Sequence, residues 1–271
     1  MEVVIGFLIA VVIALTGVGA GTITAPLLLL FLHVPVSVCV GTALAYSTLV
    51  KLIVVPVQIW RRQVNYKIVG LMVLGGVPGV IFGSLLFKRV ALQGGQAFLY
   101  AALGLIIVIS SAIHVYRYFR PYGDRSEKKD RPAWVAGLML PIGAEVGFSS
   151  SGAGALGTVL LLGLTSLTAA QVVGTDLAAG LVLSMVGSGV HILNGSYDSV
   201  LLLKLVTGGV FGAIVGSTMA PRVPNKKLRL ALSLWLLAIG LQFCYQAAHA
   251  TLTDTHVGVA TRLPSTGEKR N

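Results

Sequence analysis

The sequence predicts an all-α polytopic membrane protein with about eight hydrophobic segments in two four-segment repeats. Three observations lead to this fold class. Of 271 residues, 55% are hydrophobic and only 11% are charged, and the mean hydropathy is +0.88. A soluble globule cannot bury so much apolar surface. The apolar residues also fall into runs long enough to span a bilayer, and the second half of the chain repeats the first.

The repeat is visible at a constant offset of 133 positions. This offset places Gly19 on Gly152 and Gly21 on Gly154, inside the stretches TGVGAGTITAP (16–26) and SSSGAGALG (149–157). One offset that holds over about 70 residues indicates a duplicated unit. Further matches are Val40-Gly41-Thr42 with Val173-Gly174-Thr175, Leu44-Ala45 with Leu177-Ala178, Gly75-Gly76-Val77 with Gly208-Gly209-Val210, Gly79 with Gly212, Gly83-Ser84 with Gly216-Ser217, and Arg89 with Arg222.

The first apolar segment of each repeat is too long for one simple span. A hydrocarbon core about 30 Å thick needs about 20 helical residues. Residues 3–32 and 134–164 hold 30 and 31 residues, and each carries a glycine-rich break near its middle. Backbone released from a helix at that depth must be buried in protein or line a wet cavity. The remaining segments are 36–60, 68–87, 97–116, 169–193, 200–220 and 228–248.

The chain divides into a first membrane repeat (1–116), a basic linker (117–132), a second membrane repeat (133–249) and a polar tail (250–271). The tail has no periodicity and is expected to be disordered. The linker holds six Lys and Arg residues and is therefore predicted to be cytoplasmic, together with Arg61 and Arg62 two spans upstream.

The basic residues change loops between the two repeats. Residues 194–199 contain none, whereas residues 222–229 contain four. This pattern predicts that the repeats are inverted in the membrane, so that each crosses an odd number of times or its first segment dips in and returns. The alternative is eight plain crossings.

The net charge of +11 lies mainly in short connecting loops, as in other membrane proteins, so no nucleic-acid partner is expected. Cys39 and Cys244 both stand in apolar runs, where a thiol behaves as a small hydrophobe. No disulfide, metal or cofactor is expected.

The glycines of the breaks, Gly17, Gly19 and Gly21 with Gly152 and Gly154, predict that a second half-helix begins near Thr22 in one repeat and near Gly154 in the other. The first turn of a helix has unpaired N–H groups and a partial positive charge, so it binds anions. The alternative is that these small residues only permit close helix packing. The predicted substrate-binding residues are Thr22, Thr42, Lys51, Ser149, Ser150, Ser151 and Thr175.

Lys51 lies about two-thirds along its segment and is either a counter-charge for an anion or a lysine that reaches toward the cytoplasmic face. Glu145 precedes the second break, where the helix dipole and the low dielectric both disfavour a charged carboxylate. Asp176 follows Thr175, replaces Ala43 of the first repeat, and is unfavourable there without a partner. Glu145 and Asp176 are the predicted proton-coupling residues, and a structural hydrogen bond is the alternative for each.

The chain resembles the TauE/SafE family of membrane permeases, often called sulfite exporters, over residues 3–248. The paired breaks, the paired Gly-Thr motifs at Gly41-Thr42 and Gly174-Thr175, and the glycine pairs 75–76 and 208–209 carry the resemblance. It implies a secondary transporter that moves small anions, such as sulfite or sulfoacetate, across the inner membrane with the proton gradient. Pro26 is matched by Val159, and Ala43 and Asp176 stand where a serine is expected, which leaves the substrate open.

The expected partners are a small anionic substrate, protons and the lipid bilayer. A homodimer is one assembly that the sequence leaves open. A passive anion channel is an alternative function. An intramembrane serine protease built on Ser150 or Ser151 with His191 is a rival, but Val18 matches Ser151 and no oxyanion-hole donor can be named. The chain is therefore not expected to be an enzyme.

Overall fold

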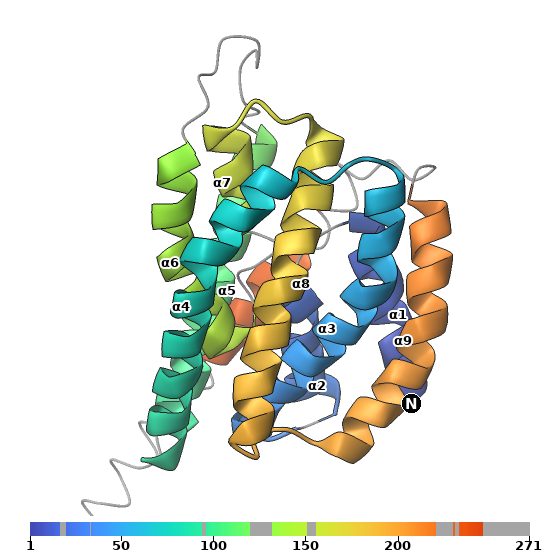
Figure 1. Cartoon of the computed structure of the whole chain (residues 1–271). Helices are drawn as coiled ribbons and strands as arrows, with labels where there is room; N and C mark the ends of the chain where they lie inside the picture. Colours follow the sequence, from blue (N-terminus) through green and yellow to red (C-terminus); the bar gives the residue numbers. More distant parts are fainter. Residues whose placement is uncertain are drawn as a thin grey trace, which may run out of the picture.

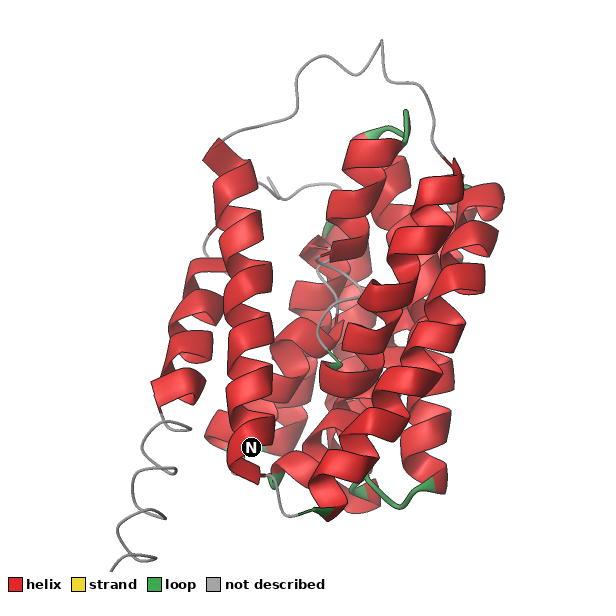
Figure 2. Cartoon of the chain, turned by 90° about the vertical axis from the view of Figure 1, so that its left-hand side faces the viewer, coloured by secondary structure: helices red, strands yellow, loops and turns green. Residues whose placement is uncertain are grey.

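The computed structural model describes residues 1–16, 20–32, 34–93, 96–119, 132–150, 156–220, 230 and 233–245. Within these residues, every regular element is a helix, and the helices pack in one bundle (Figure 1, Figure 2). They are α1 (Glu2–Thr16), α2 (Ala20–Phe31), α3 (Val36–Trp60), α4 (Tyr66–Leu92), α5 (Gln96–Phe119), α6 (Pro132–Ser149), α7 (Leu156–Leu164), α8 (Ala169–Leu193) and α9 (Ser199–Met219), followed by a helix at Ser233–Tyr245.

The predicted helical class is confirmed, and both long segments are interrupted. The first segment forms α1 and α2, and the fifth forms α6 and α7. At the end of α6 the chain leaves the helix through Ser150, whose φ of +66° lies in the left-handed region that non-glycine residues seldom adopt. The two second halves begin at Ala20 and Leu156, two residues from the predicted starts at Thr22 and Gly154.

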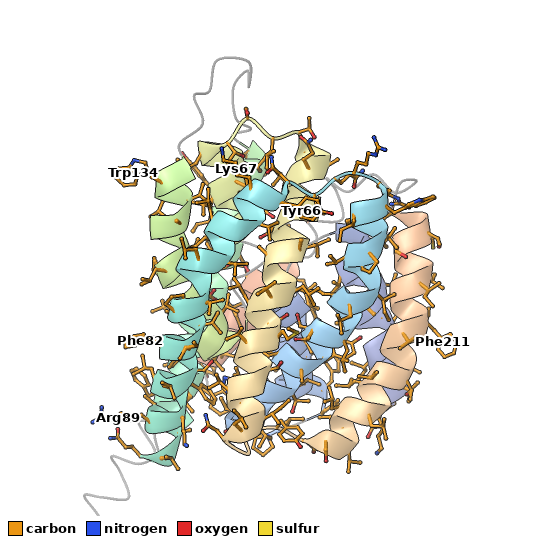
Figure 3. The ribbon with its side chains drawn as sticks, viewed as in Figure 1. Tyr66, Lys67, Phe82, Arg89, Trp134 and Phe211 are labelled. Carbon is orange, nitrogen blue, oxygen red and sulfur yellow. The ribbon has the colours of Figure 1, made fainter. Side chains whose placement is uncertain are left out.

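The outer surface of the bundle is apolar, as a bilayer requires. Phe82, Trp134 and Phe211 point away from the bundle with 64%, 62% and 68% of their surface exposed (Figure 3). Four described helices, α3, α4, α8 and α9, are long and apolar enough to cross a membrane, and shorter apolar helices accompany them. The chain is therefore a multi-pass membrane protein.

Helices α3 and α8 lie against each other at the centre and run antiparallel (Figure 1). Gly41, early in α3, meets the side chain of His191 late in α8, whereas Leu44 meets Gly187 one turn earlier in α8. Much of α3 is buried, which makes it the core helix of the first half. The charged residues described below lie at this contact.

Glycines bring α4 against α6 and α9 against α1. A Cβ on Gly79 of α4 would lie 2.1 Å from the carbonyl oxygen of Leu140 on α6, and one on Gly212 of α9 would lie 2.3 Å from that of Phe7 on α1. Only glycine permits such an approach of two backbones. The two contacts are equivalent in the two repeats. At the 133-residue offset Gly79 corresponds to Gly212, and Phe7 corresponds to Leu140. The same relation joins Gly75 and Ala136 to Gly208 and Val3, and Gly83 and Ala144 to Gly216 and Val11.

Each broken segment starts and ends at the same end of the bundle (Figure 1). Helix α1 runs parallel to α9 and α3. Helix α2 returns antiparallel to α3 (Figure 1), and the Sγ of Cys39 near the start of α3 donates to the carbonyl oxygen of Ala25. In the second half, α6 runs parallel to α4 and α8, and α7 returns along α8. The two interruptions therefore reverse the direction of the chain.

Candidate functional site

Lys51 of α3 is a positive charge enclosed within the bundle. Its side chain is 2% exposed, and its Nζ donates a 3.0 Å hydrogen bond to the carbonyl oxygen of Gly180 on α8. This is its one hydrogen bond to the part of the chain that the structure describes, although an ammonium group has three donors. The alternative in which Lys51 reaches toward the cytoplasmic face is wrong, because its Nζ is bonded to α8 inside the bundle. An enclosed charge of this kind marks functional positions in membrane proteins.

Asp176 supplies a negative charge next to this lysine. It precedes Gly180 by one helical turn on α8 and is 2% exposed. Its carboxylate interacts electrostatically with the ammonium group of Lys51. The Oγ1 of Thr158 on α7 donates a 2.7 Å hydrogen bond to Oδ2 of Asp176. Lys51 and Asp176 thus form a charge pair between the two central helices.

The first turn of α7 lies against the carboxylate of Asp176. A Cβ on Gly157 would lie 2.2 Å from Oδ1 of Asp176, so glycine is needed at this contact. Since α7 begins at Leu156, the carboxylate faces the positive end of the helix. The helix start that the sequence predicts as an anion site is therefore next to an anion of the protein itself. Sequence reasoning missed Thr158, although a hydroxyl in the first turn of a half-helix was a usable signal.

A second polar cluster lies at the C-terminal end of α6. The Oγ of Ser149 donates a 2.8 Å hydrogen bond to Oε1 of Glu145. The second carboxylate oxygen of Glu145 and the Oγ of Ser150 are buried and have no hydrogen-bond partner among the described residues. Two oxygen atoms at one helix end are thus left for a ligand.

Helices α4 and α8 hold the end of α6 in place. The carbonyl oxygen of Gly147 accepts a 3.0 Å hydrogen bond from Nε2 of His191 on α8 and a 3.3 Å hydrogen bond from Oγ of Ser84 on α4. The ring of Phe87 packs edge-on against His191 and Phe148, with centroids 5.3 Å and 5.7 Å apart. The ring of His191 is therefore buried and makes its hydrogen bond within the core.

The two polar clusters lie at different depths. Gly180, which binds Lys51, and His191, which binds the end of α6, are separated by eleven positions on α8. At about 1.5 Å per residue, this is a separation of about 16 Å along the helix. The charge pair and the Glu145 cluster are therefore separate sites.

Thr42 and Thr175 join the two halves of the chain. The Oγ1 of Thr42 accepts a 2.9 Å hydrogen bond from the backbone N–H of Asp198, and that of Thr175 accepts a 3.0 Å hydrogen bond from the N–H of Asn65. Asp198 and Asn65 are the N-cap residues of α9 and α4. Each hydroxyl thus stabilises the start of a helix in the other half, and its predicted contact with substrate stays a prediction.

The remaining predicted residues lie at the interruptions. Gly21 and Thr22 belong to α2, but the Thr22 side chain is outside the described residues. Ser151 and the break glycines Gly17, Gly19, Gly152 and Gly154 also lie outside them. The described residues contain no cluster of three or more His, Cys, Asp or Glu side chains able to hold a metal ion.

Residues 3–243 match the family described as Sulfite exporter TauE/SafE. The chain belongs to this family. Three probable membrane transporter proteins of Bacillus subtilis (strain 168) are similar to it: YjnA, 26% identical over 248 residues (89% of this chain, 97% of the relative), YdhB, 24% over 245 (88% and 97%), and YunE, 24% over 266 (90% and 96%). No solved structure matches the chain.

Membership in TauE/SafE confirms the family resemblance drawn from the sequence. This TauE/SafE protein is a membrane transporter rather than an enzyme, so the serine protease alternative is removed. Its partners include a small-molecule substrate and the lipid bilayer. The charge pair of Lys51 and Asp176 then becomes the first candidate for the place where that substrate binds.

Proposed function

We propose that this TauE/SafE protein is a secondary transporter of small anions, with sulfur oxyanions or organosulfonates such as sulfite or sulfoacetate as substrates and protons as the coupling ion. The observation that carries the proposal is the enclosed positive charge of Lys51 between α3 and α8, with a single hydrogen bond to Gly180. The description of the family supports a sulfur-containing anion. The transporter works by alternating access in the inner membrane.

The charge pair offers a mechanism for coupling. When Asp176 is ionised, its carboxylate neutralises Lys51 and occupies the first turn of α7. Protonation of Asp176 removes that negative charge, and Lys51 and the N–H groups at the start of α7 become available to an anion. The anion and the proton therefore favour each other's binding and move in the same direction. Glu145, the second predicted proton-coupling residue, lies outside this pair.

We propose in addition that the two repeats are inverted in the membrane. The antiparallel course of α3 and α8 supports this arrangement, as do the contacts that recur at the 133-residue offset. Each broken segment enters and returns, so each repeat crosses the bilayer an odd number of times. The linker 117–132 and Arg61 then face the cytoplasm together with the basic loop that follows α9. A site between two such repeats can open to either side in turn.

The proposal is tested with purified protein in proteoliposomes. Uptake of sulfite, sulfoacetate, thiosulfate and sulfate is measured with and without a pH gradient. We expect the gradient to drive accumulation of at least one of these anions. An anion flux that does not depend on the pH gradient and shows no counterflow would instead indicate a passive anion channel.

Three variants assign the roles in the same assay. Lys51→Met is expected to abolish uptake, because the counter-charge is lost. Asp176→Asn is expected to retain anion exchange across the membrane but to lose the response to the pH gradient. Lys204→Met is the matched control, since Lys204 is a half-exposed lysine that pairs with Glu2 at the surface. Uptake by Lys51→Met at the unmodified rate would contradict the proposal.

A further inference from the structure

We infer that the C-terminal end of α6 binds a small monovalent cation such as Na⁺ through Glu145, Ser149 and Ser150. The inference rests on the proposed function in one respect, since a cation bound there would be a coupling ion of the transporter. It concerns a site about 16 Å along α8 from the charge pair.

The charge at this helix end favours a cation. The last carbonyl groups of a helix have no partner within the helix and carry a partial negative charge. Glu145 adds a carboxylate in the last turn, and the hydroxyls of Ser149 and Ser150 add two more oxygen atoms. The inference assigns a cation to Ser149 and Ser150, whereas the sequence analysis predicts that they bind the anionic substrate.

Two enclosed oxygen atoms point to a ligand. Ser150 is 3% exposed, and neither its Oγ nor Oε2 of Glu145 has a hydrogen-bond partner among the described residues. Ser149 already donates its proton to the other carboxylate oxygen. A proton on Oε2 would need an acceptor within hydrogen-bond distance, and the described part of the chain offers none. Both atoms belong to the C-terminal end of α6, and a cation bound at this end is the ligand that the inference assigns to them.

The surroundings of α6 favour a single positive charge. Its packing neighbours contribute His191, which donates to Gly147, and Asp176, which belongs to the distant charge pair. Among the side chains that the structure describes, the other titratable groups on helices packed against α6 are Tyr66, Lys67, Lys88 and Arg89 of α4 and Tyr100 and Tyr116 of α5. Glu145 is thus the one carboxylate at this end of α6 in the described chain. A divalent ion would remain half-neutralised in a low dielectric, which is unfavourable.

The inference is tested by binding of Na⁺ alone, without any anionic substrate. The thermal unfolding midpoint of the purified protein in detergent is measured while NaCl replaces choline chloride at constant ionic strength. We expect a saturable rise, because a ligand that binds only the folded state stabilises it. Glu145→Gln should remove the rise, and Ser150→Ala should raise the half-saturating Na⁺ concentration by about tenfold. Ser111→Ala is the matched control, because its Oγ on α5 is also buried without a partner among the described residues.

A midpoint that is the same in NaCl and choline chloride would overturn the inference, as would a Na⁺ response that survives in Glu145→Gln. If Glu145→Gln does not fold, the line width of ²³Na in nuclear magnetic resonance compares Ser150→Ala with Ser111→Ala, and equal widths overturn the inference. Since no anion is present, failure of this test leaves the proposed anion transport standing. Loss of anion uptake with Na⁺ binding intact would contradict only the proposed function.

Discussion

Thr158 of α7 donates a 2.7 Å hydrogen bond to Asp176 of α8, and this contact joins the broken segment of the second half to the charge pair at the centre. Gly157 makes the contact possible, because a side chain there would collide with the carboxylate. A movement of α7 would therefore change the position of the Asp176 carboxylate. It would also change the electrostatic interaction of that carboxylate with Lys51. The start of α7 and the charge pair are thus in direct contact.

Thr158→Val should destabilise the protein by about 1–3 kcal/mol, because an enclosed carboxylate loses a donor. The measurement is the free energy of unfolding in detergent. Thr165→Val is the matched control, since Thr165 directly follows α7 and its hydroxyl donates to the carbonyl oxygen of Leu161 four residues earlier, where such a bond contributes little. Equal losses for the two variants would show that the contact with Asp176 is unimportant.

Lys51→Met and Asp176→Asn should each destabilise the protein by about 3–5 kcal/mol, because each leaves an uncompensated charge in the core. The double variant should lose much less than the sum of the two, since neither charge remains. The free energies of unfolding of the unmodified protein, the two single variants and the double variant give the interaction energy between the two side chains. Additive losses would show that the two groups do not interact. The double variant should still fail in the uptake assay, which separates stability from transport.

Gly79→Ala and Gly212→Ala should each destabilise the bundle by about 1–3 kcal/mol, because a methyl group would force two helix backbones apart. Gly70→Ala is the control within α4, since nothing lies within 4 Å of a Cβ at that position. It should be neutral or stabilising by up to about 1 kcal/mol. The measurement is the thermal unfolding midpoint of each variant. A Gly79→Ala protein as stable as the unmodified protein would contradict the close packing of α4 on α6.

The sequence predicted the fold well because its strongest signals are simple. Apolar runs and glycine breaks follow directly from the bilayer and from the backbone, so α3 and α8 begin and end at the predicted residues. The roles of individual residues were harder to predict. A Ser or Thr in an apolar segment gives the same sequence pattern whether its hydroxyl binds the substrate or a backbone group. Thr42 and Thr175 were predicted as substrate ligands, and the structure shows bonds to Asp198 and Asn65 that no local pattern contains.

Thr42→Val and Thr175→Val should destabilise the protein by similar amounts, about 1–3 kcal/mol, because each leaves a helix-capping N–H group without its acceptor. Their KM for the transported anion should stay unchanged if the hydroxyls only hold helices together. Thr48→Val is the control, since Thr48 bonds only to Leu44 of its own helix among the described residues. A large rise in KM without loss of stability would assign the hydroxyls to the substrate.

Cysteine labelling tests the inverted arrangement of the repeats. In the bundle, Tyr66 lies at the opposite end from Arg89 (Figure 3), the loop between α7 and α8 lies at the Tyr66 end, and the start of α9 lies at the other end (Figure 1). Single cysteines at Tyr66, Ser166 and Ser199 are introduced after Cys39 and Cys244 are replaced by alanine. An impermeant maleimide is then applied to intact cells and to inverted membrane vesicles.

Cysteines at positions 66 and 166 should react only in inverted vesicles, because these ends of the helices face the cytoplasm if the basic loops do. The cysteine at position 199 should react only in intact cells. Eight plain crossings give another result, since a broken segment that crossed fully would place positions 66 and 166 on opposite sides of the membrane. Opposite labelling of these two positions would therefore contradict both the inverted repeats and the return of α7 along α8.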